Sequence, residues 1–260
     1  MKERSYMKKI FVTLVLVAMA LSTWAVDLPK QGIGIQIGWA QPILRLNRAD
    51  NPSSAKDSLT SITKMKGFKV GVVYDGSIIA GFGSSIGINY TFAAANSGWQ
   101  ANNSSFSEYP RNRQLITYHE MEVFVDWQYK FEVAKETYLM LYTGPTIQCG
   151  LAFDMRTDKQ NDFGGPITYT HGNGYNPSKD DYTRLDEENN HFKRLNVTWG
   201  IGAGFQYKQY FLRGGYDFGL IDPYYNSQFV DKSGNTLDHY TRGRLDQWNI
   251  RIGMYLWYKD

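Results

Sequence analysis

Residues Leu115 to Phe153 read LITYHEMEVFVDWQYKFEVAKETYLMLYTGPTIQCGLAF, and this stretch decides the fold. In its first half, apolar and polar residues separate into two alternating rows. One row is Met121, Val123, Val125, Trp127 and Tyr129, and the other is Glu120, Glu122, Phe124, Asp126 and Gln128. A period of two is the signature of a β-strand. Carboxylates opposite an unbroken apolar row indicate one face in hydrocarbon and one in a wet or self-paired interior, as in transmembrane β-barrels.

The second half of the stretch repeats this pattern after a short polar link, which we predict at Lys130 to Thr137. The apolar row that follows is Leu139, Leu141, Ile147, Cys149, Leu151 and Phe153. Cys149 is the single cysteine of the chain, so it has no partner for an internal disulfide. We expect its thiol to be buried or to face lipid.

The rest of the chain repeats the hairpin. The same alternation predicts six further strands, at residues 32–46, 68–74, 79–92, 195–207, 210–220 and 247–258. Asp75-Gly76, between the second and third strands, is a tight-turn signal. Lys208-Gln209 is predicted as a second tight turn.

The connections between these strands are alternately long and short. Antiparallel barrels with short periplasmic turns and long extracellular loops show this asymmetry. The predicted fold class is therefore all-β: a closed antiparallel up-and-down transmembrane β-barrel of about eight strands. Both of its ends are expected in the periplasm.

Composition agrees with a barrel and argues against other classes. The chain has 260 residues, a formal net charge of +3, 15% aromatic residues and 25 glycines. Its mean hydropathy of −0.44 is too low for a helical membrane protein, whereas a barrel averages its apolar and polar rows. Because the charge is small and no basic stripe with interleaved aromatics occurs, we expect no nucleic-acid partner.

The first 25 residues have the pattern of a secretory signal peptide. Four cations precede an apolar run from Ile10 to Leu21, and Thr23-Trp24-Ala25 supplies small residues for cleavage after Ala25. The apolar run is shorter than the roughly 20 residues that a spanning helix needs. We predict a signal peptide at 1–25 and a barrel domain at 26–260. Translation from Met7 would give an equally complete signal.

A soluble lipocalin-like barrel is the alternative fold. It would turn its apolar face inward around a ligand and its polar rows outward. The polar rows here contain repeated glycines, which would expose backbone on a solvent face. The apolar rows carry aromatic residues at the strand ends, as interfacial girdles do. Both features favour the membrane barrel.

Three motifs resemble the bacterial outer-membrane β-barrel domain families, PorT-like and OmpA-like. They are Thr117 to Glu120 leading into Trp127 to Phe131, then Tyr142 to Pro145, and Gly215 to Leu220. The resemblance covers Gly32 to Tyr258. It implies the fold and a location in the bacterial outer membrane, but no single activity.

The last strand resembles the signal that the barrel-assembly machinery reads. The residues that carry this resemblance are Arg251, Gly253, Leu256 and Tyr258. Many such proteins end on an aromatic residue, whereas this chain continues with Lys259-Asp260. The resemblance implies the assembly machinery as a partner during biogenesis, in addition to outer-membrane lipid.

Seven charged residues fall on the inward rows and form the candidate site. They are Lys69, Glu120, Glu122, Asp126, Arg213, Asp217 and Arg251. An eight-stranded lumen is only wide enough for its own side chains, and unpaired buried charge is costly. We therefore expect a lumen charge network in which one of the four carboxylates holds Arg213 or Arg251. The alternative is a selectivity filter or proton path.

No catalytic residue, cofactor site or metal site is predicted. His119 points outward near the external rim, with Thr117 as the only hydroxyl on that face of its strand. A lipid-trimming acyl-transfer site there would need an orienting acid, which is missing, so an interfacial histidine is expected. His171, His191 and His239 lie near acidic loop residues without metal-ligand spacing.

These observations leave three functions open. The first is a non-enzymatic outer-membrane barrel with a side-chain-filled lumen. It would act through its extracellular loops, chiefly 154–193, in structural, adhesion or secretion and assembly roles, with a protein partner at those loops. The second is a small channel for ions or solutes, and the third is a lipid-modifying enzyme.

Overall fold

The computed structural model describes residues 31–48, 64–79, 81–101, 111–160, 168–173, 193–223, 229–230, 236–237 and 240–259. The predicted signal peptide and most of the long connections lie outside these ranges. The described part of the chain contains no helix that is long and apolar enough to span a membrane.

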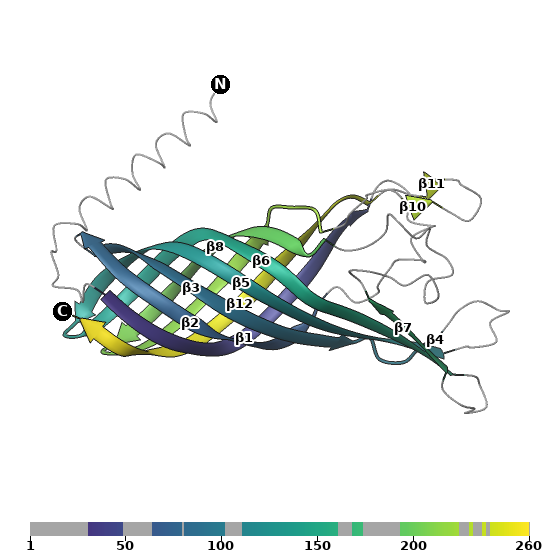
Figure 1. Cartoon of the computed structure of the whole chain (residues 1–260), viewed down its shortest axis with the longest axis horizontal. Helices are drawn as coiled ribbons and strands as arrows, with labels where there is room; N and C mark the ends of the chain where they lie inside the picture. Colours follow the sequence, from purple (N-terminus) through teal and green to yellow (C-terminus); the bar gives the residue numbers. More distant parts are fainter. Residues whose placement is uncertain are drawn as a thin grey trace, which may run out of the picture.

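Eight antiparallel strands form a closed ring (Figure 1). They are β1 (Gln31–Arg48), β2 (Lys66–Ile79), β3 (Phe82–Asn96), β5 (Arg111–Ala134), β6 (Thr137–Gln160), β8 (Leu195–Tyr207), β9 (Tyr210–Gly219) and β12 (Tyr240–Lys259). Each strand pairs with the next in this order, and β12 pairs back onto β1. The predicted antiparallel up-and-down barrel of eight strands is confirmed.

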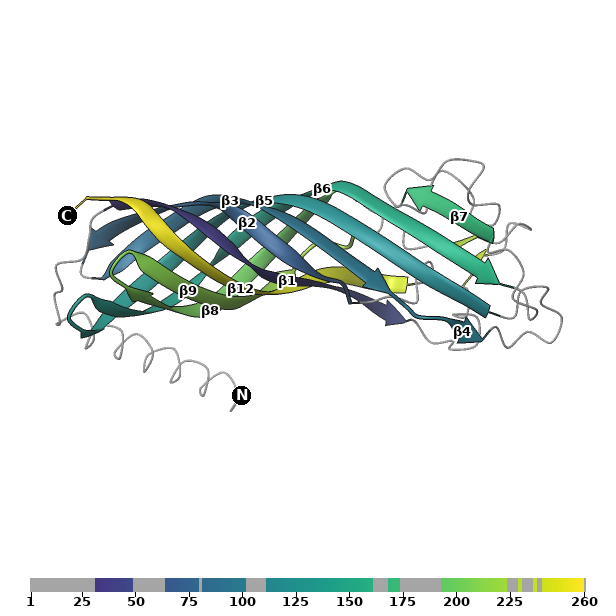
Figure 2. The same ribbon diagram turned by 90° about the horizontal axis from the view of Figure 1, so that it is seen from below.

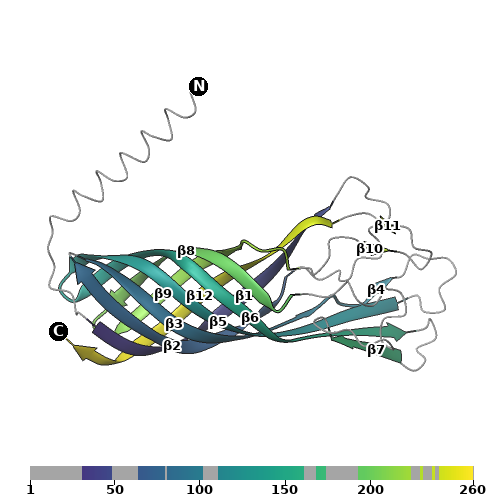
Figure 3. The same cartoon turned by 45° about the horizontal axis from the view of Figure 1, so that its top comes forward.

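Four short strands lie beyond the ring, at the end with the long connections. β4 (Gln100–Ala101) pairs with β5, β7 (Thr168–Asn173) pairs with β6, and β10 (Phe229–Val230) pairs with β11 (Thr236–Leu237). Figures 2 and 3 show that β5 and β6 project past the other strands, with β4 and β7 on either side. This projection is called the β5–β6 extension below.

The other end of the barrel carries the tight turns. β5 and β6 are joined at Lys135-Glu136, and β8 and β9 at Lys208-Gln209 as predicted. Glu136 has a φ of 58° and Lys208 a φ of 53°, the left-handed conformation that lets two antiparallel strands join closely. β1 begins and β12 ends at this same end (Figure 1). The predicted alternation of long and short connections is therefore present.

Two predicted turn regions are strand instead. Asp75-Gly76 is no turn, because β2 continues to Ile79 and Asp75 pairs with Gly32 on one side and Ser85 on the other. The predicted link at Lys130 to Thr137 is reduced to two residues, since β5 runs to Ala134. In both places the ladder hydrogen bonds of the neighbouring strands outweigh the local turn preference.

Over most of the barrel the two rows of a strand differ sharply in burial. Along β3, for example, Ile86 and Ile88 are exposed while Ser85 and Asn89 are fully covered. One predicted outward residue, Phe153, instead points inward. A β-bulge causes this, because the pairing between β5 and β6 shifts by one residue after His119, and one extra residue reverses every later side chain.

Candidate functional site

Polar side chains from all eight ring strands fill the barrel interior. Burying a polar or charged group without a partner is costly, so charged groups in the interior are expected to pair with one another. Two connected clusters account for most of the buried charges. Each is held by strands that are far apart in sequence.

The Arg213 cluster lies in the half of the barrel with the tight turns. Arg213 Nη2 donates to both oxygens of Asp75 at 3.0 Å, and Nη1 donates to Ser85 Oγ at 2.9 Å. Lys130 Nζ donates to Asp75 Oδ2 at 3.0 Å, and the Tyr255 hydroxyl donates to the same oxygen. One carboxylate therefore holds two cations through charge-assisted hydrogen bonds, which are stronger than neutral ones.

The Lys69 cluster lies further toward the long connections. Lys69 Nζ contacts both oxygens of Glu122 at 2.7 Å and also donates to Gln247. Asn89 Nδ2 donates to Glu122 at 2.6 Å, and Gln247 Nε2 donates to Glu120 at 3.0 Å. A lysine and two glutamates are thus joined through amide side chains.

Apolar side chains form a buried cluster beyond the Lys69 cluster. This apolar cap comprises Leu44, Met65, Ala93, Ile116, Tyr118 and Phe153. The Tyr118 ring meets Phe153 edge-on at 5.8 Å between centroids, and the Tyr118 hydroxyl donates to Glu120 at 2.5 Å. Tyr118 therefore connects the cap to the charged cluster below it. The inward turn of Phe153 at the bulge supplies a large part of the cap.

A second apolar cluster surrounds the Arg213 cluster. It consists of Val73, Phe124, Met140, Phe211 and Tyr255. The Arg213 guanidinium lies over the Phe211 ring, 5.1 Å from its centroid. Aromatic faces stabilise a cation in a dry site.

Glycines in the inward rows make room for these aromatic rings. The Tyr142 ring occupies the space that a Cβ atom would need at Gly202, and its hydroxyl comes close to Gly215. Gly253 is covered in the same way by the Phe211 ring. The predicted small-residue rows are thus the places where interior rings touch the wall.

Six of the seven predicted site residues are buried in the interior, and Asp217 is half-buried. Among themselves they form one ion pair within 4.0 Å, between Lys69 and Glu122. Arg213 is held by Asp75, which is not one of the four predicted carboxylates. Among the described residues Arg251 forms no ion pair; its guanidinium lies 5.2 Å from the centroid of the Phe124 ring.

The sequence reasoning missed Asp75 and Lys130, although a usable signal exists. Lys69, Gly71 and Val73 face inward, and Asp75 is the next residue of the same alternating row. Likewise the inward row of β5 continues through Gln128 to Lys130. The turn signal at Asp75-Gly76 and the polar link at Lys130 to Thr137 place both residues in predicted connections, where the alternation is not expected to continue.

His119 lies on the outer wall in an aromatic group. Its Nδ1 atom is 2.6 Å from the Tyr90 hydroxyl, and the Phe92 ring meets it edge-on at 5.0 Å. Nδ1 is the atom that an orienting acid would need, and here a phenol occupies it. In the described ranges no three His, Cys, Asp or Glu residues are grouped to hold a metal ion. His191 and His239 lie outside those ranges.

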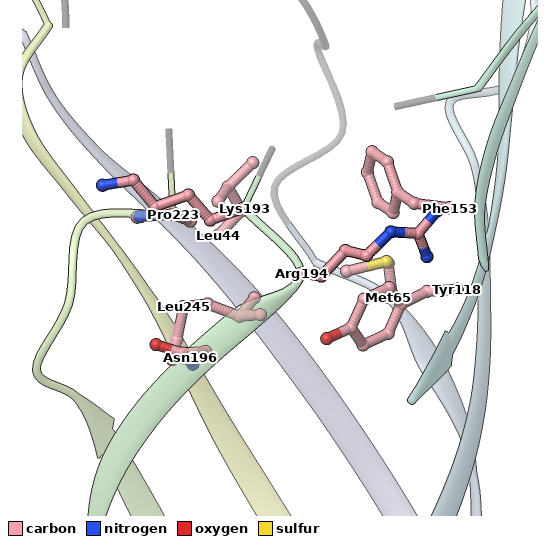
Figure 4. A pocket seen from close by; sticks show the side chains of 9 residues that line it. All are labelled: Leu44, Met65, Tyr118, Phe153, Lys193, Arg194, Asn196, Pro223 and Leu245. Carbon is pink, nitrogen blue, oxygen red and sulfur yellow. Dashed lines mark hydrogen bonds between the residues drawn. The ribbon is translucent and has the colours of Figure 1, made fainter. Parts of the chain in front are cut away.

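A pocket opens at the outer side of the apolar cap (Figure 4). Its empty volume is about 410 Å³, including the part open to solvent. Its lining residues are Leu44, Met65, Tyr118, Phe153, Lys193, Arg194, Asn196, Pro223 and Leu245. Arg194 Nη1 donates to the backbone oxygens of Gly150 at 3.1 Å and Leu151 at 2.9 Å. The pocket therefore has an apolar floor, and one of its two cations is tied to the wall.

Comparison with known proteins decides the family. The profile of the outer membrane protein beta-barrel domain family matches residues 34–224. The chain belongs to this family. As an outer-membrane barrel it lies in the bacterial outer membrane, its exposed apolar row faces lipid, and Cys149 is part of that row. No curated protein matches the chain.

Solved structures of other outer-membrane barrels are similar to it. The attachment invasion locus protein Ail of Yersinia pestis is 10% identical, with a TM-score of 0.38, over 87% of this chain and 99% of Ail. Neisserial surface protein A is 11% identical, with a TM-score of 0.39, over 86% and 97%. A mutant of the monoaromatic hydrocarbon channel TodX is 8% identical, with a TM-score of 0.25, over 89% and 91%.

Proposed function

We propose that this outer-membrane barrel is non-enzymatic, has a closed interior, and acts through its extracellular end in structural, adhesion or secretion and assembly roles. The observation that carries the proposal is the filled interior. The Arg213 and Lys69 clusters occupy it, and the apolar cap lies between them and the outside. In this proposal the interior offers no wet path, and the parts free to meet a partner are those beyond the barrel.

The balance of interior charge supports a plug over a pore. With Asp75 and Lys130 added, the interior holds five carboxylates and four cations. A selective pore is typically lined by rings of one charge sign. Near-balance instead allows the charges to neutralise one another, as the Asp75 and Glu122 ion pairs do.

Site-specific photo-crosslinking tests where the protein meets its partner. A photoreactive residue at Lys159 would lie on the β5–β6 extension, and one at Lys135 would lie at the opposite end, as a matched exposed lysine. We expect protein adducts from Lys159 in native membranes and none beyond background from Lys135. Adducts from Lys135 alone, or lipid adducts alone at Lys159, would refute action through the extracellular end.

A small channel is the second candidate function. Two observations favour it: Arg251 has no ion pair among the described residues, and Asp217 is half-buried, with a hydrogen bond to Asn249 at 2.8 Å. A chain of such groups could admit water and ions past the two clusters. Conductance of the purified barrel separates the two candidates.

We also propose that the barrel-assembly machinery reads the end of β12. The residues concerned are Arg251, Gly253, Leu256 and Tyr258, in the strand that closes the ring against β1. Leu256 is exposed on the outer wall, whereas Arg251 is buried and Gly253 is covered by the Phe211 ring. In this proposal the inward residues secure ring closure, and the outward residue remains available for recognition.

A further inference from the structure

The outer wall carries a carboxylate that is completely covered. Asp246 belongs to the outward row of β12, next to Trp248, yet it has no exposed surface. Arg45 Nε lies 2.7 Å and Arg244 Nε 3.2 Å from its Oδ2 atom. The Tyr216 hydroxyl donates to the same oxygen at 2.5 Å, and the Gly219 backbone N–H donates to Oδ1 at 2.9 Å. The Asp246 side chain is therefore fully engaged in positioning its neighbours.

The two arginines that contact Asp246 lie directly opposite each other on neighbouring strands. Arg45 on β1 pairs with Arg244 on β12, two strands that lie side by side in Figure 2. Both side chains remain about half exposed, at 48% and 49%. Because Asp246 takes the Nε edge of each guanidinium, the Nη edges are left for another group. Among the described residues their one hydrogen bond is from Arg45 Nη2 to the Tyr216 hydroxyl, at 3.2 Å.

Two lysines extend this group along the wall. Ile43 of β1 pairs with Asp246 of β12 on one side and forms an isolated bridge with Lys64 on the other. Lys64 therefore lies on the side of β1 that faces away from β12. Lys66 begins β2 on the same outward row, and both lysines are exposed. Four cations thus lie on or next to three neighbouring strands around Asp246, and two of them, Arg45 and Arg244, contact its carboxylate. On the wall of β6 and β8, by contrast, the apolar residues Leu151 and Leu195 are exposed.

The level of the patch on the wall indicates its ligand. Asp246 is one outward position beyond Trp248, and Lys66 is one beyond Phe68, both exposed aromatic residues. Aromatic residues at strand ends mark the border between hydrocarbon and headgroups. The arginine and lysine side chains therefore lie where lipid headgroups lie. The anionic group at that depth is phosphate, and a guanidinium fork can bind it with two hydrogen bonds.

We propose that the wall of β12, β1 and β2 binds the phosphate group of an outer-leaflet lipid. Arg45 and Arg244 are the ligands, Asp246 is the positioning residue, and Lys64 and Lys66 add attraction. This site is separate from the lumen and does not depend on whether the barrel is closed.

Native mass spectrometry of the full barrel, refolded in lipid-free detergent, tests the proposal. The probes are a synthetic bisphosphorylated glucosamine lipid, the same lipid without phosphates, and inorganic phosphate. One variant combines Arg45→Gln, Arg244→Gln and Asp246→Asn, so that no carboxylate is left unpaired. A second is Lys64→Gln with Lys66→Gln, which leaves Asp246 and its partners intact. The control is Lys135→Gln with Lys208→Gln, two exposed cations at the opposite rim.

We expect the wild type to retain the phosphorylated lipid in preference to the dephosphorylated one. Each cation near a membrane surface contributes about fivefold in affinity, so both variants should lose at least that much while the control keeps the preference. If the triple variant does not refold, the lysine variant decides. Equal retention of both lipids, an equal loss in the control, or binding of inorganic phosphate without the lipid would overturn the proposal.

Discussion

Asp75 is the residue on which the interior depends most. It is the shared partner of Arg213, Lys130 and Tyr255. Its carboxylate offsets two cations that are themselves buried, so its loss leaves both without an ion-pair partner among the described residues. Removing one shared carboxylate lowers the stability of the fold strongly, because it leaves two buried cations without a compensating charge.

Asp75→Asn should therefore destabilise the barrel by about 3–5 kcal/mol, the usual cost of breaking a buried pair. The measurement is a urea titration of the barrel refolded into lipid vesicles. Asp217→Asn is the matched control, since Asp217 is inward but half-buried and forms no ion pair with a described residue. Equal losses in the two variants would contradict the central place of Asp75.

At the scale of the element, the cost of placing a charge on the outward row of a strand depends on how deep in the bilayer the residue lies. Ile88 is exposed in the middle of β3, and Leu195 is exposed where β8 begins, near the rim. Arginine at the middle of the membrane costs about 2–4 kcal/mol, and near the interface about 0–1 kcal/mol. We expect Ile88→Arg and Leu195→Arg to differ accordingly in vesicle refolding titrations. Similar costs would show that the row does not cross hydrocarbon.

The β5–β6 extension has its own polar anchor outside the membrane. Asp158 is buried and accepts hydrogen bonds from Arg113 Nη2 at 2.5 Å and Arg156 Nε at 2.6 Å. Burial disfavours its charged form, but the two arginines outweigh this and hold the pKa of Asp158 below its ordinary value. Arg113 also lies over the Trp99 ring, 4.8 Å from the centroid.

Since the folded-state pKa of Asp158 is lowered, its contribution to stability is present at neutral pH. That contribution is lost as the pH falls through the folded value. The protection factors of the backbone amides in residues 111–116 and 155–160, which correct for the intrinsic pH dependence of exchange, should therefore fall below about pH 4, while those in the β8–β9 hairpin stay unchanged. Asp158→Asn should show the faster exchange already at neutral pH. Protection factors in these segments that do not change with pH would contradict the role of Asp158.

The sequence predicts the strands well because the period of two is a local property. It fails at Asp75-Gly76 and at Lys130, where a local turn signal competes with ladder pairing that depends on distant strands. The sequence also predicts the wrong side for Phe153. The bulge that reverses this side chain depends on pairing with β5, and the apolar-polar alternation of β6 alone does not reveal it. The interior partners are hardest to predict: Arg213 and Asp75 are 138 residues apart, and only the barrel register brings them together.

For the whole molecule, the central claim is that the interior is sealed. The Arg213 cluster fills the half with the tight turns, the Lys69 cluster fills the other half, and the apolar cap lies beyond both. The outer wall, the lipid-phosphate site and the β5–β6 extension then carry the contacts with the surroundings. In the proposed function, such a barrel presents surfaces to its partners and does not transport solutes.

Single-channel recording of the purified wild-type barrel in planar bilayers tests that claim most directly. Folding of the barrel is verified beforehand by the heat-dependent gel shift that closed barrels show, and its insertion is verified by reconstitution into vesicles of the same lipid. We predict no steady conductance step, because self-neutralised charges and the apolar cap leave no hydrated path. Steady, resolvable steps whose ion preference changes with Arg251→Ala, while stability does not change, would contradict the claim and establish a channel.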